Sequence, residues 1–268
     1  MSKIDQLFSD LKSKNERAFM PFITAGDPSI DFTLELIREF DSIGCHLCEV
    51  GIPYSDPIAD GPVIQASYSR ALDSGFQLDN LLERLPETAK NVSMPLVSMV
   101  SYSIIYRKGL SSYVAAAKQA GFSGAIVPDC PLESVKELSA VCRDADFSLI
   151  QLVTPTTPLE RAKEIATHST GFIYFVSVTG ITGERSSAPD QALSKISQLR
   201  EHTDLPICLG FGISTPEHVT AIGDAVDGFI VGSAIVRRVE EQQDSDKAVP
   251  QISEFAQSVL SAVQKLKS

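Results

Sequence analysis

The chain has 268 residues, with 23 lysines and arginines against 34 aspartates and glutamates, so its formal net charge is −11. This length allows one large domain or two small ones, with a core that needs no disulfide or metal to stabilise it. The acidic balance and the lack of a lysine or arginine block argue against binding of nucleic acid or an anionic membrane, because phosphate backbones demand clustered positive charge. The composition leaves open a basic partner, or a small substrate held by local hydrogen-bond donors.

Localisation follows from what the sequence does not contain. No apolar run approaches the roughly 18 residues that a membrane span needs, and the first residues lack the basic-then-apolar pattern of a secretory signal. We therefore expect a cytoplasmic protein.

The five cysteines are odd in number and irregular in spacing, which argues against a disulfide framework. Cys45 and Cys48 have CxxC spacing, but no second Cys or His pair completes a metal set, so we predict that both are simply packed in the core. HExxH, GxxxxGK[ST] and GxSxG motifs do not occur in the sequence. It therefore gives no support to a zinc peptidase, a P-loop protein or a hydrolase with a nucleophile elbow.

The chain alternates short apolar runs, turns rich in Gly, Pro and Asp, and helical patterns, which is typical of β/α units. Apolar residues at helical spacing follow the first run and also mark the end of the chain. The runs predict eight strands, at Ala18–Thr24, His46–Val50, Pro95–Val100, Gly124–Pro128, Ser148–Val153, Gly171–Ser177, Leu205–Gly210 and Gly228–Val231. Their almost continuous apolar character suits parallel strands covered on both faces.

Eight such units in about 250 residues favour a single (β/α)₈ TIM barrel over a doubly wound sheet. We predict one domain over residues 1–268 and find no linker. The polar stretch Glu240–Lys247 is better interpreted as a surface turn before a final amphipathic helix. An extra helix from Ile4 to Leu11 precedes the first strand and could plug the bottom of the barrel.

In such a barrel the chemistry belongs at the C-terminal ends of the strands. The loop after the second strand packs three prolines, two glycines and three carboxylates into residues 49–62, which predicts a shaped loop. Glu49 at the strand end has apolar neighbours, so we expect a raised pKa and transfer of protons in both directions. Asp60, near helix N-terminal donors, should stay ionised. Alternatively, Asp56 and Asp60 are caps and turn residues, and Glu49 pairs with a basic side chain.

Two further loops are candidates. Gly210, Phe211 and Gly212 after the seventh strand, with Gly232 and Ser233 after the eighth, predict a phosphate cradle, because backbone N–H groups can approach an anion closely at glycine. Simple tight turns are the alternative. Residues 178–190 after the sixth strand are long and polar, which is typical of a lid, or of disordered surface.

Four segments carry a resemblance to a known family. They are Phe-Ile-Thr-Ala-Gly-Asp-Pro from Phe22, Glu-Val-Gly-Ile-Pro-Tyr-Ser-Asp-Pro-Ile-Ala-Asp-Gly-Pro-Val-Ile-Gln from Glu49, Val-Ser-Val-Thr-Gly-Ile-Thr-Gly from Val176, and Gly-Phe-Gly-Ile-Ser from Gly210. In this order, over essentially the whole chain, they resemble the tryptophan synthase alpha chain, and the segment from Glu49 is the most specific of them.

The resemblance implies a lyase of tryptophan biosynthesis that cleaves indole-3-glycerol phosphate to indole and glyceraldehyde 3-phosphate by a retro-aldol reaction. It implies that Glu49 protonates indole C3 and then takes the hydroxyl proton, while Asp60 accepts a hydrogen bond from the indole N–H. The residues implied for the indole pocket are Phe22, Val100, Ile126 and Tyr174; those implied for the phosphate are Gly183, Gly212, Gly232 and Ser233; and Thr182 would close the lid onto the loop of Asp56 to Asp60.

The resemblance also implies partners. No cofactor or metal is expected in this chain; a beta chain carrying pyridoxal phosphate would join indole to serine, in an assembly of two alpha and two beta chains. The loops after the second and third strands would face it. Ser103 and Ile104 depart from the family's pattern in the second of these loops, whereas Tyr102 is kept.

Three other interpretations stay open. Another phosphosugar barrel, such as an epimerase or indole-glycerol-phosphate synthase, would need a histidine metal set or a catalytic lysine at strand ends; His46, His168, His202 and His218 do not have that placement. A regulatory subunit without cleavage of its own, which only activates a beta chain, is the second. A free-standing producer of indole is the third.

Overall fold

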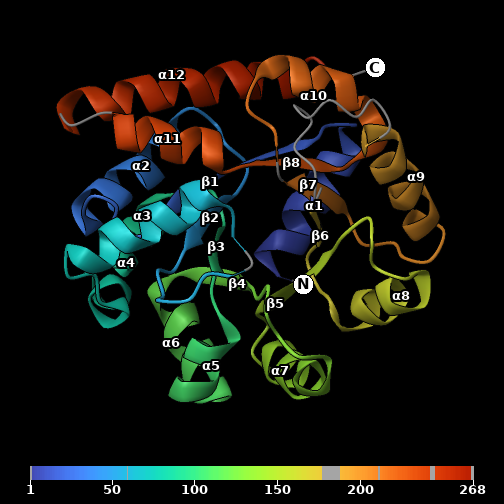
Figure 1. Ribbon diagram of the computed structural model, residues 1–268, viewed down its shortest axis with the longest axis horizontal. Helices are drawn as coiled ribbons and strands as arrows, with labels where there is room; N and C mark the ends of the chain where they lie inside the picture. The colour runs from blue at the N-terminus through green and yellow to red at the C-terminus, as the bar shows by residue number, and fades with distance from the viewer. Residues whose placement is uncertain (1, 59, 177–187, 211, 242–244, 267–268) are drawn as a thin grey trace.

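The computed structural model describes residues 2–58, 60–176, 188–210, 212–241 and 245–266, without the side chains of 132, 188–191 and 245–247. Within these ranges eight parallel strands form a closed barrel in chain order, with β8 pairing back to β1 (Figure 1). The strands are β1 (Ala18–Thr24), β2 (Cys48–Gly51), β3 (Leu96–Met99), β4 (Phe122–Ile126), β5 (Ser148–Val153), β6 (Ile173–Val176), β7 (Ile207–Gly210) and β8 (Gly228–Val231). The predicted TIM barrel is confirmed.

Three strands, β1, β5 and β8, have the predicted bounds, and the others are displaced by a few residues. The strand β4 was expected to run to Pro128 but ends at Ile126. Proline has no N–H for the ladder, so a strand tends to end before it. At β2 the expected start, His46, lies before the strand, and its Nδ1 accepts a hydrogen bond from the Phe19 N–H at 3.0 Å.

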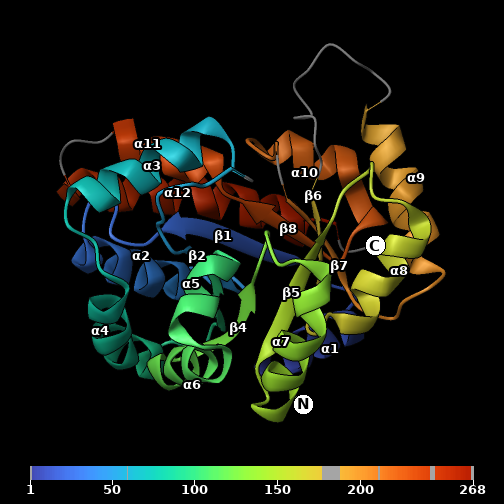
Figure 2. The ribbon, with the colours of Figure 1, turned by 60° about the horizontal axis from the view of Figure 1, so that its bottom comes forward.

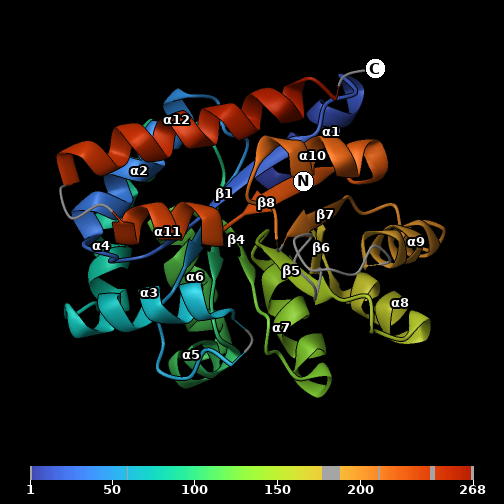
Figure 3. The same ribbon diagram turned by 45° about the horizontal axis from the view of Figure 1, so that its top comes forward.

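Helices surround the barrel. They are α1 (Lys3–Ser13), α2 (Ile30–Ser42), α3 (Pro62–Asp73), α4 (Leu78–Asn91), α5 (Tyr102–Lys108), α6 (Leu110–Ala120), α7 (Leu132–Asp144), α8 (Leu159–His168), α9 (Ala188–Arg200), α10 (Pro216–Ile222), the 3₁₀ helix η1 (Gly223–Ala225), α11 (Ser233–Glu241) and α12 (Ser245–Gln264). Figure 3 shows the long helix α12 lying along α11 and α10, which it contacts. Among the described helices, none is long and apolar enough to cross a bilayer.

The turn expected over Glu240–Lys247 is shorter than predicted. Its first two residues belong to α11 and its last three to α12, while 242–244 lie outside the described residues. The polar composition of this stretch marks solvent exposure, which helical surface shares with turns, and so it could not distinguish the two.

The apolar core has two layers, because successive side chains of a strand point to opposite faces. Val97 and Met99 of β3 belong to a cluster inside the barrel, whereas Leu96 belongs to the cluster between the barrel and its helices. Cys45 and Cys48 are buried in that outer cluster with free thiols, which confirms that they are packed in the core.

The helix α1 covers the bottom of the barrel, as expected (Figure 2). It begins with a capping box in which the Ser2 hydroxyl accepts from the Asp5 N–H and the Asp5 carboxylate accepts from the Ser2 N–H. Its buried face joins the cluster inside the barrel, and the Phe8 ring lies 5.6 Å from the ring of Phe172 between centroids. The opposite end of the barrel is left for ligands.

Truncation of the buried Phe8 side chain of α1 should destabilise the protein. Replacing a buried Phe by Ala costs about 3–5 kcal/mol, so Phe8→Ala should lower the midpoint of urea unfolding clearly. Lys12→Ala, on the exposed face of the same helix, should change the free energy of unfolding by less than about 0.5 kcal/mol. Equal shifts for the two variants would contradict the role of α1 as a plug.

Candidate active site

A cavity of about 330 Å³ opens at the C-terminal ends of the strands. Two carboxyl groups, Glu49 and Asp60, lie in its wall, and glycines, serines and an arginine line another part. Its lining residues are Phe22, Glu49, Asp60, Gly61, Pro62, Val63, Ile64, Met99, Pro128, Leu152, Tyr174, Val176, Gly212, Ile213, Ser214, Ile230, Gly232, Ser233, Ala234 and Arg237. The two loop regions predicted from sequence therefore meet at one cavity.

Glu49 sits within β2, opposite Phe22 of β1 in the register, and its side chain points into the barrel. It is only 1% exposed, and neither carboxyl oxygen has a hydrogen-bond partner among the described residues. Burial, and secondarily the nearby charge of Asp60, raise the pKa of Glu49 to about 8. At neutral pH the group therefore carries a proton that it can donate into the cavity.

The close packing around this carboxyl depends on Gly51. A Cβ at this position would lie 2.5 Å from Cζ of Phe22 and 2.8 Å from the hydroxyl of Tyr68. Any side chain here would displace the ring of Phe22, which lines the cavity. The glycine is thus required by close approach and not by backbone conformation.

Asp60 lies just before α3 in the loop after β2. Gln65 holds this loop by donating from Nε2 to the carbonyls of Pro57, at 3.1 Å, and Asp60, at 2.8 Å. Burial, with the charge of Asp129 second, raises the pKa of Asp60 to about 6. The expected influence of helix N-terminal donors is therefore outweighed, although a pKa of about 6 still leaves Asp60 mostly ionised at pH 7.

Asp129, in the loop after β4, is itself held by the loop after β3. Its carboxylate accepts from the Ser101 hydroxyl at 2.6 Å and from the Tyr102 N–H at 2.7 Å, where α5 begins. Because the charge of Asp129 also raises the pKa of Asp60, the N-terminus of α5 helps to set the electrostatic surroundings of Asp60. Nothing in the sequence indicated this connection.

The apolar wall differs in part from the prediction. Phe22 and Tyr174 line the cavity as expected. Ile126 lies inside the barrel but not on the cavity wall, and Val100 belongs to the outer cluster, beyond the barrel. Met99, the last residue of β3, lines the cavity in place of Val100, because successive side chains of an extended chain point in opposite directions. A strand that is apolar throughout does not reveal which residues face inward.

The glycine-rich wall of the cavity also differs from the sequence prediction at one position. Gly212, with φ of +82°, lines the cavity together with Gly232 and Ser233. Gly210 does not line it: a Cβ there would lie 2.2 Å from Cε2 of Tyr174, so this glycine makes room for the tyrosine ring. The predicted Thr182, Gly183 and Phe211 lie outside the described residues, as does most of the predicted lid.

Arg237 is a lining residue that the sequence reasoning missed. It is on α11, four residues after Ser233, so both side chains lie on one face of the helix. That spacing is the signal that could have found it. Among the lining residues that the structure describes, it is the sole cationic side chain.

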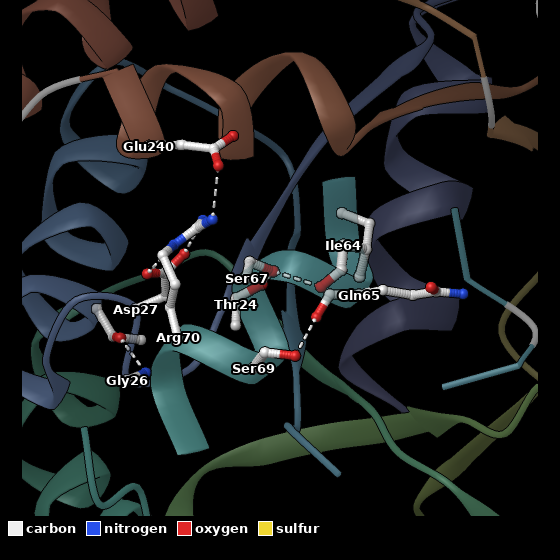
Figure 4. Close-up of polar contacts among 10 residues, drawn as sticks. Thr24, Gly26, Asp27, Ile64, Gln65, Ser67, Ser69, Arg70 and Glu240 are labelled. Carbon is white, nitrogen blue, oxygen red and sulfur yellow. Dashed lines mark hydrogen bonds and ion pairs between the residues drawn. The ribbon is translucent and has the colours of Figure 1, made fainter. Parts of the chain in front are cut away.

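An ion-pair network fixes the helix that follows the Asp60 loop (Figure 4). Arg70 of α3 donates to both oxygens of the buried Asp27, at 3.1 and 2.7 Å, and to Glu240 of α11 at 3.1 Å. The hydroxyls of Thr24 and Ser67 lie 2.6 Å apart beside it. Three elements that border the cavity, β1, α3 and α11, are thereby held together.

Comparisons with known proteins point to one family. The family model described as tryptophan synthase alpha chain matches residues 8–264. A tryptophan synthase alpha chain of Rhodopirellula baltica is 55% identical over 251 residues, covering 92% of this chain and 90% of the relative. One of Arabidopsis thaliana is 40% identical over 261 residues, covering 97% and 95%. The structure of the tryptophan synthase A-subunit of Pyrococcus furiosus has a TM-score of 0.84 at 34% identity, covering 92% and 99%.

Burial of Glu49 should make stability depend on pH. Its pKa of about 8 in the folded chain exceeds the unfolded value of 4.5, so the folded chain retains a proton that the unfolded chain loses between these pH values. Stability should therefore fall as pH rises through this window. Glu49→Gln removes the effect, so its thermal midpoint relative to the parent should rise from pH 5 to pH 9. The exposed Glu83→Gln is the matched control; a rise of the same size there would refute the explanation.

Proposed function

The chain belongs to the tryptophan synthase alpha chain family, and we propose that it catalyses the retro-aldol cleavage of indole-3-glycerol phosphate to indole and glyceraldehyde 3-phosphate with Glu49 and Asp60 as its catalytic residues. The observation that carries the assignment of these residues is the buried, unpartnered carboxyl of Glu49 beside Asp60 in an apolar cavity.

The proposed reaction needs one group that both gives and takes a proton. Protonated Glu49 delivers its proton to indole C3, which leaves a cationic ring. The resulting carboxylate then removes the proton of the side-chain hydroxyl next to the C–C bond. As this bond breaks, its electron pair returns to the ring, the hydroxyl carbon becomes the aldehyde, and Glu49 is protonated again.

Asp60 has a different role in this proposal. Its pKa of about 6 leaves it charged at neutral pH, so it can accept a hydrogen bond from the indole N–H and stabilise the positive charge that develops on the ring. Phe22 and Tyr174 provide the apolar wall for the indole. No step assigned to these residues calls for a metal or cofactor.

The phosphate belongs, in this proposal, at the glycine-rich part of the cavity. Gly212 and Gly232 allow backbone N–H groups to approach an anion closely, and Ser233 begins α11, where the helix dipole favours negative charge. Arg237 adds a positive charge in a cavity that otherwise carries carboxylates. Thr182 and Gly183 are proposed to close over the ligand from the loop after β6.

A beta chain is the partner that the family implies. We propose an assembly of two alpha and two beta chains in the cytoplasm, with pyridoxal phosphate in the beta chain. The exposure of two large apolar side chains is the evidence for placing the docking face at the segments after β2 and β3. Ile58 is 88% exposed, and Tyr106 of α5 is 70% exposed. Such side chains gain free energy when a partner covers them.

The first experiment is release of indole from indole-3-glycerol phosphate by the purified chain, with and without a beta chain. We expect slow release that rises with the partner, and a loss of about 10²–10⁴-fold in Glu49→Gln, as for a general acid–base group. Undiminished release by Glu49→Gln would refute the catalytic assignment. No release under either condition would favour a regulatory subunit, and fast release alone a free-standing lyase.

The pH dependence of cleavage tests both carboxyl groups. The free enzyme needs Glu49 protonated and Asp60 ionised, so kcat/KM should decline below about pH 6 and above about pH 8. The substrate phosphate also titrates near pH 6. Asp60→Asn separates the titration of Asp60 from that of the phosphate. In this variant turnover should fall overall, and the decline of kcat/KM below pH 6, the acid limb of the profile, should become smaller. An acid limb of unchanged size would contradict the role of Asp60.

The docking face can be tested at a site remote from the carboxyl groups. Tyr106→Ser should leave the basal release of indole unchanged and weaken the apparent affinity for the beta chain. Leu72→Ser is the matched control, because Leu72 is 36% exposed on α3 and outside the proposed face. Equal loss of stimulation in both variants would argue against this face.

A further inference from the structure

The loop after β7 is held by a histidine that lies outside the cavity. Gly212, Ile213 and Ser214 of this loop line the cavity, and α10 begins two residues later. His218, in the first turn of α10, points its ring back at the loop. The ring is not among the lining residues, so it does not touch a ligand itself.

One ring nitrogen of His218, Nδ1, contacts Gly212 and Ser214 of this loop. Nδ1 of His218 lies 3.1 Å from the carbonyl oxygen of Gly212, 3.3 Å from the N of Ser214 and 3.5 Å from the Ser214 hydroxyl. The backbone N–H of His218 also donates to the Thr215 carbonyl at 3.2 Å, which fixes the start of the helix relative to the loop. The imidazole thus bridges the two residues that flank Ile213.

The chemistry of imidazole gives this contact two forms. With Nδ1 unprotonated, it accepts from the Ser214 N–H; with Nδ1 protonated, it donates to the Gly212 carbonyl. In either form one of the two backbone groups is satisfied by the ring, and the loop is tied to α10. Gly212 has φ of +82°, a conformation that glycine adopts without strain and other residues do not. The backbone of Gly212 and Ser214 is therefore held in this arrangement by contacts that include the ring of His218.

We propose that His218 is a positioning residue for the anion-binding loop, and that it sets the affinity for the phosphate end of the substrate without contributing to the proton transfers. This inference rests on the proposed function, in which Gly212 helps to hold the phosphate. Backbone groups must be preorganised to bind an anion tightly, since ordering them on binding would consume part of the affinity.

The test uses two substitutions at one position. Asn places a polar atom near the position of Nδ1 and can accept or donate, so His218→Asn should preserve the tie. His218→Leu fills similar space and removes it. Thr220→Val, on the exposed face of the same short helix, controls for a general effect on α10.

Two ligands distinguish the ends of the cavity. Glyceraldehyde 3-phosphate carries the phosphate, and indole does not. His218→Leu should weaken binding of glyceraldehyde 3-phosphate by roughly 5- to 30-fold, the effect expected when one or two hydrogen bonds are lost, while indole binds as before. In cleavage, KM should rise with kcat nearly unchanged, because the loss is in binding shared by substrate and transition state. His218→Asn should lie within about 3-fold of the parent.

Three results would overturn the inference. Parent-like binding of glyceraldehyde 3-phosphate by His218→Leu would show that the loop needs no tie, and equal weakening of indole would show general damage to the barrel. A parent protein that cleaves no indole-3-glycerol phosphate and binds no glyceraldehyde 3-phosphate would overturn the proposed function, and this inference with it. If the parent cleaves normally and only the selective effect is missing, the inference fails alone.

Discussion

The site depends on a carboxyl group kept inside a barrel with no described residue to neutralise it. Glu49 has apolar walls and the charge of Asp60 as its surroundings, and both raise its pKa to about 8. An ordinary glutamic acid would be ionised at neutral pH and could only accept protons. Burial converts the same side chain into a donor, at the expense of stability above the unfolded pKa. The closed barrel makes this environment possible, because its interior is packed with apolar side chains and its strand ends converge.

Much of the remaining structure supports the loops around that group. Gln65 and the network of Arg70, Asp27 and Glu240 hold the elements on either side of Asp60. At the other part of the cavity, His218 ties the loop after β7 to α10. These supports are polar contacts between elements far apart in sequence. They hold the loops that line the cavity in place, and a wall that is ordered in advance loses less free energy when a ligand binds.

Several residues near the site show why composition alone misled at particular positions. Gly210 was predicted to approach phosphate, yet its missing side chain accommodates the ring of Tyr174. Val100 was predicted to face indole, yet it points to the helices while Met99 faces the cavity. At Gly210 the close approach that glycine allows is made by the tyrosine ring, and at Val100 the apolar contact is made with the outer cluster. The direction in which the residue faces is a property of register, which a continuously apolar strand does not display.

The sequence by itself determined the eight β/α units, the barrel and the plugging helix, because these follow from local pattern. It also singled out Glu49, Asp60, Gly212, Gly232 and Ser233, which all line the one cavity, because they stand in motifs at strand ends. Tertiary structure decided which strand residues face inward, the elevation of the Asp60 pKa by burial and Asp129, and the places of Arg237 and His218 beside the cavity. The physical reason is that pKa values and cavity walls arise from groups brought together across the fold. No stretch of sequence contains those distances.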